Sequence, residues 1–540
     1  MTGGAGARRV GLAIYAVANA LCVAVFLFPL WRPASAATAY GLDDPAALGL
    51  LVLCGCAALV FEAGSAGLGP RAVAVLGVLV AINSVLRFIE VALPGPGGFT
   101  PIFALIILTG RAYGPRFGFL MGMLTLVVSA VVTGGVGPWL PYQMLTAAWV
   151  GLTAGWLPRG RGPDRPGGRA EVWGLAAFGA AWGIGYGLLM TLWFWPFIDA
   201  GAAGAAGSVT AAAARFAVFY AASSLAWDLF GAAGNAALLA LAGAPVLAAL
   251  RRMAPRIFDA DRRLMAGTRA QALRPAHGSR GTGGSEVDAP RGAPPSPTAV
   301  DARLDLPAPR AASPHPRAWV AWLTAVAALA STTRHPLVLL ALVLAVALVR
   351  ARLPARAAAG GALPVARLAA VVVPFATVYN LLMAHGGTTV VVRLPARWPL
   401  VGGPLTLEAA AYGALTGGAL ALVMLAFAAF QGALSARDIA RLIPRAFGAL
   451  ALVTAVALTY APSMRGQIAA VREAQAVRGL RLRGWRAWAP LAMPVLVGGL
   501  ERALDLADSM IARGLLPPPA PPPTAARLSI LAALGLVAGG

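Results

Sequence analysis

The 540-residue chain contains no lysine, so all 43 of its basic residues are arginine. A phosphate-binding P-loop needs a lysine that reaches the nucleotide phosphates, so this chain cannot carry one. ATP hydrolysis of the Walker type would therefore have to occur on another chain.

Charged residues are scarce, at 12% of the chain, whereas apolar residues make up 59% and the mean hydropathy is +0.75. No single water-soluble core can absorb that much hydrophobicity. The composition predicts an all-α polytopic membrane protein.

Cysteine is limited to Cys22, Cys54 and Cys56, which lie inside apolar stretches without polar ligands around them. The four histidines are scattered along the chain. We therefore expect the cysteines to pack in the interior, and we predict neither a metal site nor a catalytic site.

The net charge of +23 comes from arginines in loops and linkers, with no nucleic-acid recognition module among them. Arginine in such loops orients a membrane protein with its positive loops in the cytoplasm. The charge pattern predicts membrane lipid as a partner, no nucleic acid, and a cytoplasmic N-terminus.

Apolar segments of the first half are separated by short polar loops, and most are long enough to cross a bilayer core of about 30 Å. They fall at 10–30, 46–61, 72–93, 100–110, 117–133, 141–158, 171–198 and 215–250. Further apolar segments follow at 318–333, 336–350, 368–384 and 406–431.

Changes in composition divide the chain into regions, and the family resemblance given below adds the boundary between residues 69 and 70, which makes six regions. A Pro-, Gly- and Arg-rich stretch cannot bury enough surface to fold, and we expect it to be a disordered cytoplasmic linker. The regions are two extra membrane helices in 1–69, a membrane domain in 70–250, the linker in 251–317, membrane helices in 318–431, charged cytoplasmic helices in 432–516, and a Pro-rich spacer with a partial last membrane helix in 517–540.

Two segments near the end of the chain share one pattern, an acid five residues before an Arg-Gly pair. Glu473 precedes Arg478-Gly479, and Asp508 precedes Arg513-Gly514. An ordinary helix end also has this form, because glycine accepts the left-handed cap and arginine meets the negative end of the helix dipole. Two copies beneath a membrane domain favour exposed cationic helix ends.

Glu501, Asp505 and Asp508 are spaced at i, i+4 and i+7, which places them on one face of one helix. We expect these acids to pair with arginines of the neighbouring charged helix and to brace the two helices.

Residues 314–514 resemble the transmembrane T component of energy-coupling factor (ECF) transporters. The motifs that carry the resemblance are Pro314-His-Pro-Arg317, Ser331-Thr-Thr-Arg-His-Pro336, Gly402-Gly-Pro-Leu-Thr-Leu-Glu408, Arg441-Leu-Ile-Pro-Arg-Ala-Phe447, Arg472-Glu-Ala-Gln-Ala-Val-Arg-Gly479, Leu500-Glu-Arg-Ala-Leu504 and Ala512-Arg-Gly514.

The resemblance implies that two coupling helices dock on two ABC-type ATPase subunits, which use ATP and Mg, while this chain binds no cofactor. It implies an ATPase-coupling role for Arg478, Gly479, Ala512, Arg513 and Gly514, with Val477 standing where the second copy has Ala512. It also implies a place in the bacterial plasma (inner) membrane.

Residues 70–250 resemble an ECF substrate-binding S component. Such components bind a vitamin or similar micronutrient near the outer face of the membrane, and their first helix docks on the T component. Gly77 and Ala81 have the spacing of small residues that permits such docking. The resemblance is carried by Gly110-Arg-Ala-Tyr-Gly-Pro-Arg-Phe-Gly118, Thr133-Gly-Gly-Val-Gly-Pro-Trp-Leu-Pro-Tyr-Gln-Met144 and Val150-Gly-Leu-Thr-Ala-Gly155.

Candidate substrate-binding residues lie close to the expected outer loops. Asn83, Arg87 and Glu90 share one helical face, although Arg87 and Glu90 could equally form a structural ion pair.

A second group comprises Trp139, Tyr142 and Gln143, an aromatic platform beside an amide. Anchoring at the membrane interface would also explain the two aromatic residues.

Asp228 and Asn235 lie seven residues apart on the last span of the first half. A buried carboxylate there needs either a partner or a ligand. We therefore include both residues among the substrate-site candidates.

The sequence favours an ATP-driven importer that carries substrate-binding and coupling parts in one polypeptide. The alternative is a secondary transporter of a small organic solute, but few intramembrane charges and no mirrored halves are present. A membrane-embedded enzyme would need a clustered catalytic constellation, which the scattered histidines do not provide.

Overall fold

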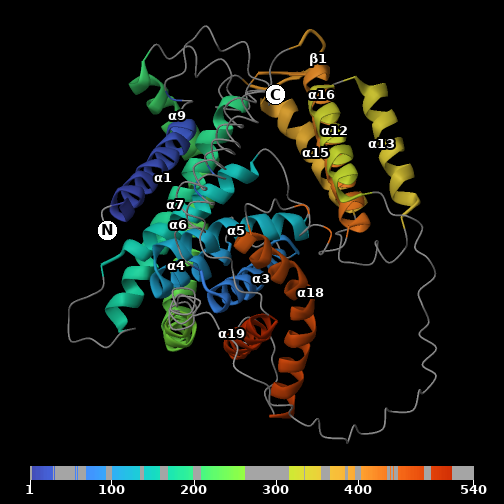
Figure 1. Cartoon of the computed structure of the whole chain (residues 1–540). Coiled ribbons are helices and arrows are strands. Elements are labelled where there is room, and N and C mark those ends of the chain that lie inside the picture. The colour runs from blue at the N-terminus through green and yellow to red at the C-terminus, as the bar shows by residue number, and fades with distance from the viewer. Residues whose placement is uncertain are drawn as a thin grey trace, which may run out of the picture.

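The computed structural model confirms the predicted fold class, because every long described element is a helix (Figure 1). Five of these helices are long and apolar enough to cross a membrane, as expected of a multi-pass membrane protein. The structure describes, apart from Arg334 and a few isolated positions, residues 3–27, 68–92, 100–133, 139–158, 168–198, 208–261, 315–353, 365–383, 387–395, 403–434, 448–478 and 488–513.

The helices of the first half follow the predicted apolar segments closely; the span predicted at 46–61 lies outside the described residues. They are α1 (Gly3–Leu27), α3 (Pro70–Ala92), α4 (Ile102–Tyr113), α5 (Pro115–Thr133), α6 (Leu140–Trp156), α7 (Arg169–Ile198), α9 (Val209–Ser223), α10 (Leu225–Ala254) and the π-helical turn η4 (Pro255–Asp259).

The single span predicted at 215–250 is wrong, because two helices, α9 and α10, occupy this region. The break is at Ser224, whose φ of −126° and ψ of −29° are not helical. Serine hydroxyls form local hydrogen bonds to the backbone that compete with a helix, and Ser223 Oγ, next to the break, donates one such bond of 2.8 Å to the Phe219 oxygen. Ser224 Oγ itself accepts a bond of 3.0 Å from Thr191 Oγ1 of α7. Helical structure also continues past residue 251, where the linker was expected to begin, as far as Asp261.

The second half contains six long helices and one short β-hairpin in the described residues. They are α12 (Pro316–Thr332), α13 (Pro336–Ala351), α15 (Val365–Met383), β1 (Val390–Arg393), β2 (Pro404–Thr406), α16 (Leu407–Ala433), α18 (Gly448–Val477) and α19 (Trp488–Ala512). The antiparallel hairpin, in which Val390 faces Thr406, was not predicted. Its exposed strand β1 does not show the apolar and polar alternation that marks a half-buried strand.

The two larger hydrophobic cores of the described residues divide the chain differently from its sequence regions. One core joins α3, α4, α5, α6 and α10 to buried residues of α18 and α19. The other lies among α12, α13 and α16. In Figure 1, α19 lies below α3, and α18 runs from beside α5 down to the bottom of the view, away from β1.

Helix α3 lies between the rest of the first half and the two C-terminal helices. Residues 72–84 are buried without interruption. A helix that is apolar on all sides must be surrounded by protein or lipid. Here α4 and α5 cover one side, and α18 and α19 cover the other.

Gly77 lies at a close approach between α3 and α18. A Cβ atom at this position would lie 2.7 Å from Val456 Cγ1 and 3.1 Å from the backbone oxygen of Val453. The structure therefore places Gly77, with the fully buried Ala81 one turn away, at the contact that the small-residue spacing predicted.

Substituting Gly77→Val should separate α3 from α18 and lower the stability of the chain. Overpacking a tight interface typically costs about 1–3 kcal/mol. Thermal unfolding of the purified chain in detergent measures the effect. Gly174→Val is the matched control, because Gly174 also lies in a helix but a Cβ there meets nothing within 4 Å. Equal unfolding midpoints for the two variants would contradict the close packing.

Candidate functional site

The two predicted coupling arginines directly follow the ends of α18 and α19. The backbone N–H of Arg478 donates to the Ala474 oxygen at 3.4 Å, and that of Arg513 donates to the Ser509 oxygen at 3.2 Å. Both bonds complete the last helical turn, so each arginine lies at a helix terminus as predicted. Gly479 and Gly514, which were expected to cap the helices, lie outside the described residues.

The side chains at these two ends are accessible to a partner. Arg478, Ala512 and Arg513 are all exposed, and Val477 is 85% exposed. The C-terminal half of α18 is exposed as well, whereas its first half belongs to the core around α3. Each helix thus presents a cation beside a small apolar surface, which a soluble protein could contact through a groove with acidic groups.

Within the described residues, no acid of α19 forms the ion pair with an arginine of α18 that the spacing had suggested. Asp508 pairs instead with Arg71 at the start of α3, with 2.8 Å between Asp508 Oδ1 and Arg71 Nη2. The expectation failed because both helices pack mainly against α3 and only marginally against each other.

Asn83 is fully buried and joins three helices. Its Nδ2 donates to the Ile102 backbone oxygen of α4 and to Thr125 Oγ1 of α5, both at 3.2 Å. This amide therefore acts as a structural tie at the centre of the first half.

Arg87 and Gln143, which were predicted in two separate groups, lie together. Arg87 Nη2 donates to Gln143 Oε1 at 3.3 Å, so the ends of α3 and α6 meet. The Glu90 side chain lies outside the described part of the chain, and the alternative pairing of Arg87 with Glu90 stays a prediction.

Tyr142 is only 6% exposed and lies between two aromatic rings. Its ring centroid is 5.1 Å from that of Phe26 in α1 and 4.8 Å from that of Trp193 in α7. Trp139 stands three residues earlier, at the N-cap of α6.

Neither Phe26 nor Trp193 was among the candidates that the sequence indicated. No signal in the sequence places Phe26 here, because the contact depends on how α1 packs against α6. The hydrogen bond of 2.8 Å from Trp149 Nε1 to Asn19 Oδ1 fixes that packing.

Asp228 has a protein partner, which was one of the two possibilities considered. Tyr220 of α9 donates its hydroxyl hydrogen to Asp228 Oδ2 at 2.9 Å, and the carboxylate lies close against Gly187 of α7. Asn235 is buried two turns further along α10. The pair therefore belongs to the packing of α7, α9 and α10, apart from the group formed by Arg87, Tyr142 and Gln143.

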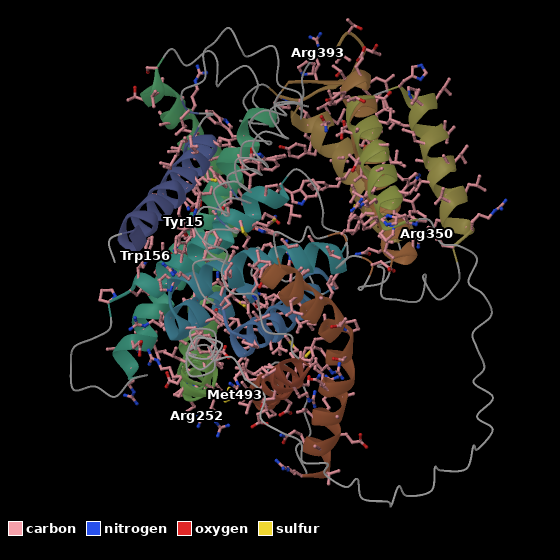
Figure 2. The ribbon with its side chains drawn as sticks, in the orientation of Figure 1. Tyr15, Trp156, Arg252, Arg350, Arg393 and Met493 are labelled. Carbon is pink, nitrogen blue, oxygen red and sulfur yellow. The ribbon has the colours of Figure 1, made fainter. Side chains whose placement is uncertain are left out.

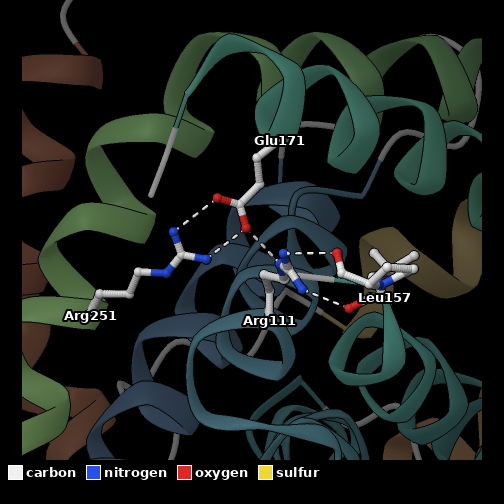
Figure 3. Close-up of polar contacts among 5 residues, drawn as sticks. Arg111, Leu157, Glu171 and Arg251 are labelled. Atoms are coloured by element: carbon white, nitrogen blue, oxygen red, sulfur yellow. Dashed lines mark hydrogen bonds and ion pairs between the residues drawn. The ribbon is translucent and has the colours of Figure 1, made fainter. Parts of the chain in front are cut away.

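A charged cluster that the sequence did not reveal joins four helices (Figure 3). Glu171 Oε1 of α7 accepts from Arg111 Nε at 2.7 Å and from Arg251 Nη2 at 2.6 Å. Arg111, whose side chain is 5% exposed, also donates to the backbone oxygens of Leu157 and Pro158. Glu171 is 60 positions from Arg111 and 80 positions from Arg251 in the sequence, so no local pattern could have indicated this cluster.

The described residues hold no group of three or more histidine, cysteine, aspartate or glutamate side chains placed to bind a metal ion. Cys22 is a buried free thiol in α1, whereas Cys54 and Cys56 lie outside the described residues.

Comparison with known families gives two matches that divide the chain in the same way as the motifs. Residues 71–242 match the family described as "ECF transporter, substrate-specific component", and residues 314–519 match the family described as "Cobalt transport protein". The chain joins an ECF substrate-specific component to an ECF transmembrane (T) component.

A curated relative supports the T-component assignment of this ECF chain. It is the energy-coupling factor transporter transmembrane protein EcfT of Leuconostoc gelidum subsp. gasicomitatum, with 37% identity over 71 residues. The match covers 12% of this chain and 26% of the relative, about a quarter of the relative's length. No solved structure matches the chain.

Replacing Glu171 with alanine should destabilise the substrate-specific half strongly. The change leaves the buried Arg111 guanidinium without its carboxylate, and breaking a buried ion pair on one side typically costs about 3–5 kcal/mol. Thermal unfolding of the purified chain in detergent tests this, with Glu473→Ala at an exposed position of α18 as the control. A loss no greater than that of the control would show that the cluster contributes little.

Proposed function

We propose that this chain is the membrane subunit of an ATP-driven importer of the ECF type. Its first half binds a vitamin or a similar micronutrient, and its second half couples uptake to two ABC-type ATPase subunits on separate chains. The observation that carries the proposal is that α18 and α19, which lead to the exposed Arg478 and Arg513, share one hydrophobic core with the substrate-specific half.

Coupling requires that a displacement at the helix ends reach the substrate-specific half. Protein interiors are close-packed, so helices that share a core transmit movement to each other. Leu500, Ala503 and Ala507 form a buried stripe on α19, and Val453 and Ala457 form one on α18. Both stripes pack against α3, so a partner that moves the two helix ends would move α3 as well.

The separate ATPase subunits would use ATP and Mg, because this chain has no lysine with which to build a P-loop. We place the chain in the bacterial plasma (inner) membrane, with the N-terminus and the linker in the cytoplasm. In support, Arg252, shortly before the linker, lies at the same end of the view as α18 and α19, whereas Arg393 of the β-hairpin lies at the opposite end (Figure 2).

The substrate would be a ring-bearing, weakly charged molecule. Trp193, which is half-buried and packs on the buried Tyr142, offers an aromatic surface, and the neighbouring Gln143 and Arg87 offer hydrogen-bonding groups at the same ends of α3 and α6. Small-molecule sites in proteins typically combine aromatic walls with a few polar groups in this way.

Replacing both coupling arginines with glutamate should abolish binding of the ATPase subunits. Losing one partner of a charged contact typically costs about 2–5 kcal/mol for each residue, so the double variant Arg478→Glu/Arg513→Glu would no longer retain the subunits. Co-purification of the two ATPases with the detergent-solubilised chain measures this. Arg472→Glu, at an exposed position nearer the middle of α18, is the control and should retain them.

Small molecules that co-purify with the same double variant should be unchanged by mass spectrometry, because the substrate-specific half is not altered. Retention of both ATPases by the double variant would overturn the coupling assignment. Uptake into vesicles by the chain alone, driven by an ion gradient, would favour the secondary-transporter alternative.

A further inference from the structure

Arg71 lies where the substrate-specific half meets the coupling helix α19. Its Nη2 is 2.8 Å from Asp508 Oδ1, and its Nη1 is 3.9 Å from Asp261 Oδ1. Asp261 follows η4 at the end of the first half, and Asp508 lies five residues before Arg513. One guanidinium thus faces a carboxylate from each half of the chain.

The position of Arg71 is fixed by the substrate-specific half. Asp261, with 5% side-chain exposure, accepts hydrogen bonds from the backbone N–H groups of Arg71 at 3.3 Å and Ala72 at 3.1 Å, and so caps α3. Gly69 lets the carboxylate approach, because a Cβ there would collide with it. Burial raises the pKa of Asp261, and the backbone hydrogen bonds and the Arg71 guanidinium oppose this rise.

The contact on the other side is different, because Asp508 is 60% exposed. An exposed ion pair adds little affinity. The apolar stripe of α19 supplies the adhesion to α3, but small and aliphatic side chains do not by themselves specify one register along the helix. A directional contact such as the pair of Arg71 with Asp508 can specify it.

The acids that share a face of α19 place a second carboxylate within one turn of this contact. Asp505 is exposed and precedes Asp508 by three residues, a displacement of about 4.5 Å along the axis at 1.5 Å per residue. If α19 moved by one turn towards its C-terminus, Asp505 would face Arg71 in place of Asp508.

We propose that Arg71 sets the register of α19 on α3 by pairing with Asp508, and that Asp505 is the carboxylate that Arg71 holds when α19 moves by one turn. Arg71 is then a positioning residue, which converts movement of α19 along its axis into two discrete states of the interface. Its part in transport rests on the proposed function, whereas the register itself does not.

Disulfide cross-linking in the full chain measures which register α19 adopts on α3. An ideal Cβ at Gly499 lies 3.4 Å from Val78 Cγ1, so Val78→Cys and Gly499→Cys should cross-link in the register seen here. A shift of one turn brings Leu496 to this place, so Val78→Cys and Leu496→Cys report the second register. Both pairs are introduced into a chain whose three native cysteines are replaced with alanine.

Asp508→Arg places a like charge against Arg71 and leaves Asp505 as its nearest carboxylate on α19. We expect the Gly499 cross-link to fall about fivefold and the Leu496 cross-link to rise correspondingly. Adding Asp505→Asn should remove the new cross-link. Ser509→Arg introduces the same charge at the neighbouring exposed position and should change neither yield.

Equal cross-linking in the Asp508→Arg and Ser509→Arg variants would overturn the proposal. So would a Leu496 cross-link that persists after Asp505→Asn is added. Because these measurements use the chain alone, they decide the role of Arg71 even if the ATPase subunits fail to bind. Failure of the ATPases to bind would count against the proposed function only.

Discussion

The burial of α3 is the constraint on which the rest of the structure depends. Its residues 72–84 have no exposed face, so other parts of the protein surround the helix on every side. Neighbouring helices of the substrate-specific half cover part of this surface, and α18 and α19 cover the rest. Separating α18 and α19 from the first half would expose the surface around Gly77 and Ala81. The two halves of the chain are therefore joined by a common core as well as by a linker.

Charged groups add direction to this apolar contact. Within the first half, Glu171 holds Arg111 and Arg251 and so fixes the ends of α4, α7 and α10 relative to each other. Between the halves, Arg71 faces both Asp261 and Asp508. Small apolar residues allow helices to approach closely and to slide, whereas an ion pair between fixed termini selects one position. The interface thus combines close apolar packing with one directional ion pair between Arg71 and Asp508.

Several elements could be predicted from the sequence because their causes are local. The spans of α3 to α7 follow runs of apolar residues, and the ends of α18 and α19 follow the placement of Arg478 and Arg513. The break at Ser224 was missed because both flanking segments are apolar, and length alone suggested one span. Among the substrate-site candidates, spacing placed Asn83 correctly on its helix, but its role as a tie depends on Ile102 and Thr125, which other helices bring to it.

The sequence alone determined that the chain is a helical membrane protein without a P-loop. It also determined that a stretch with the composition of a linker divides the chain, and that two helices near its end finish in Arg-Gly. These properties follow from composition and short-range pattern, which do not depend on how distant segments pack together. Only the tertiary structure decided that Asp508 pairs with Arg71, 437 residues away, and that Phe26 packs on Tyr142. Such contacts depend on which helices share a core, and apolar helices of similar length and composition do not encode their neighbours in any local signal.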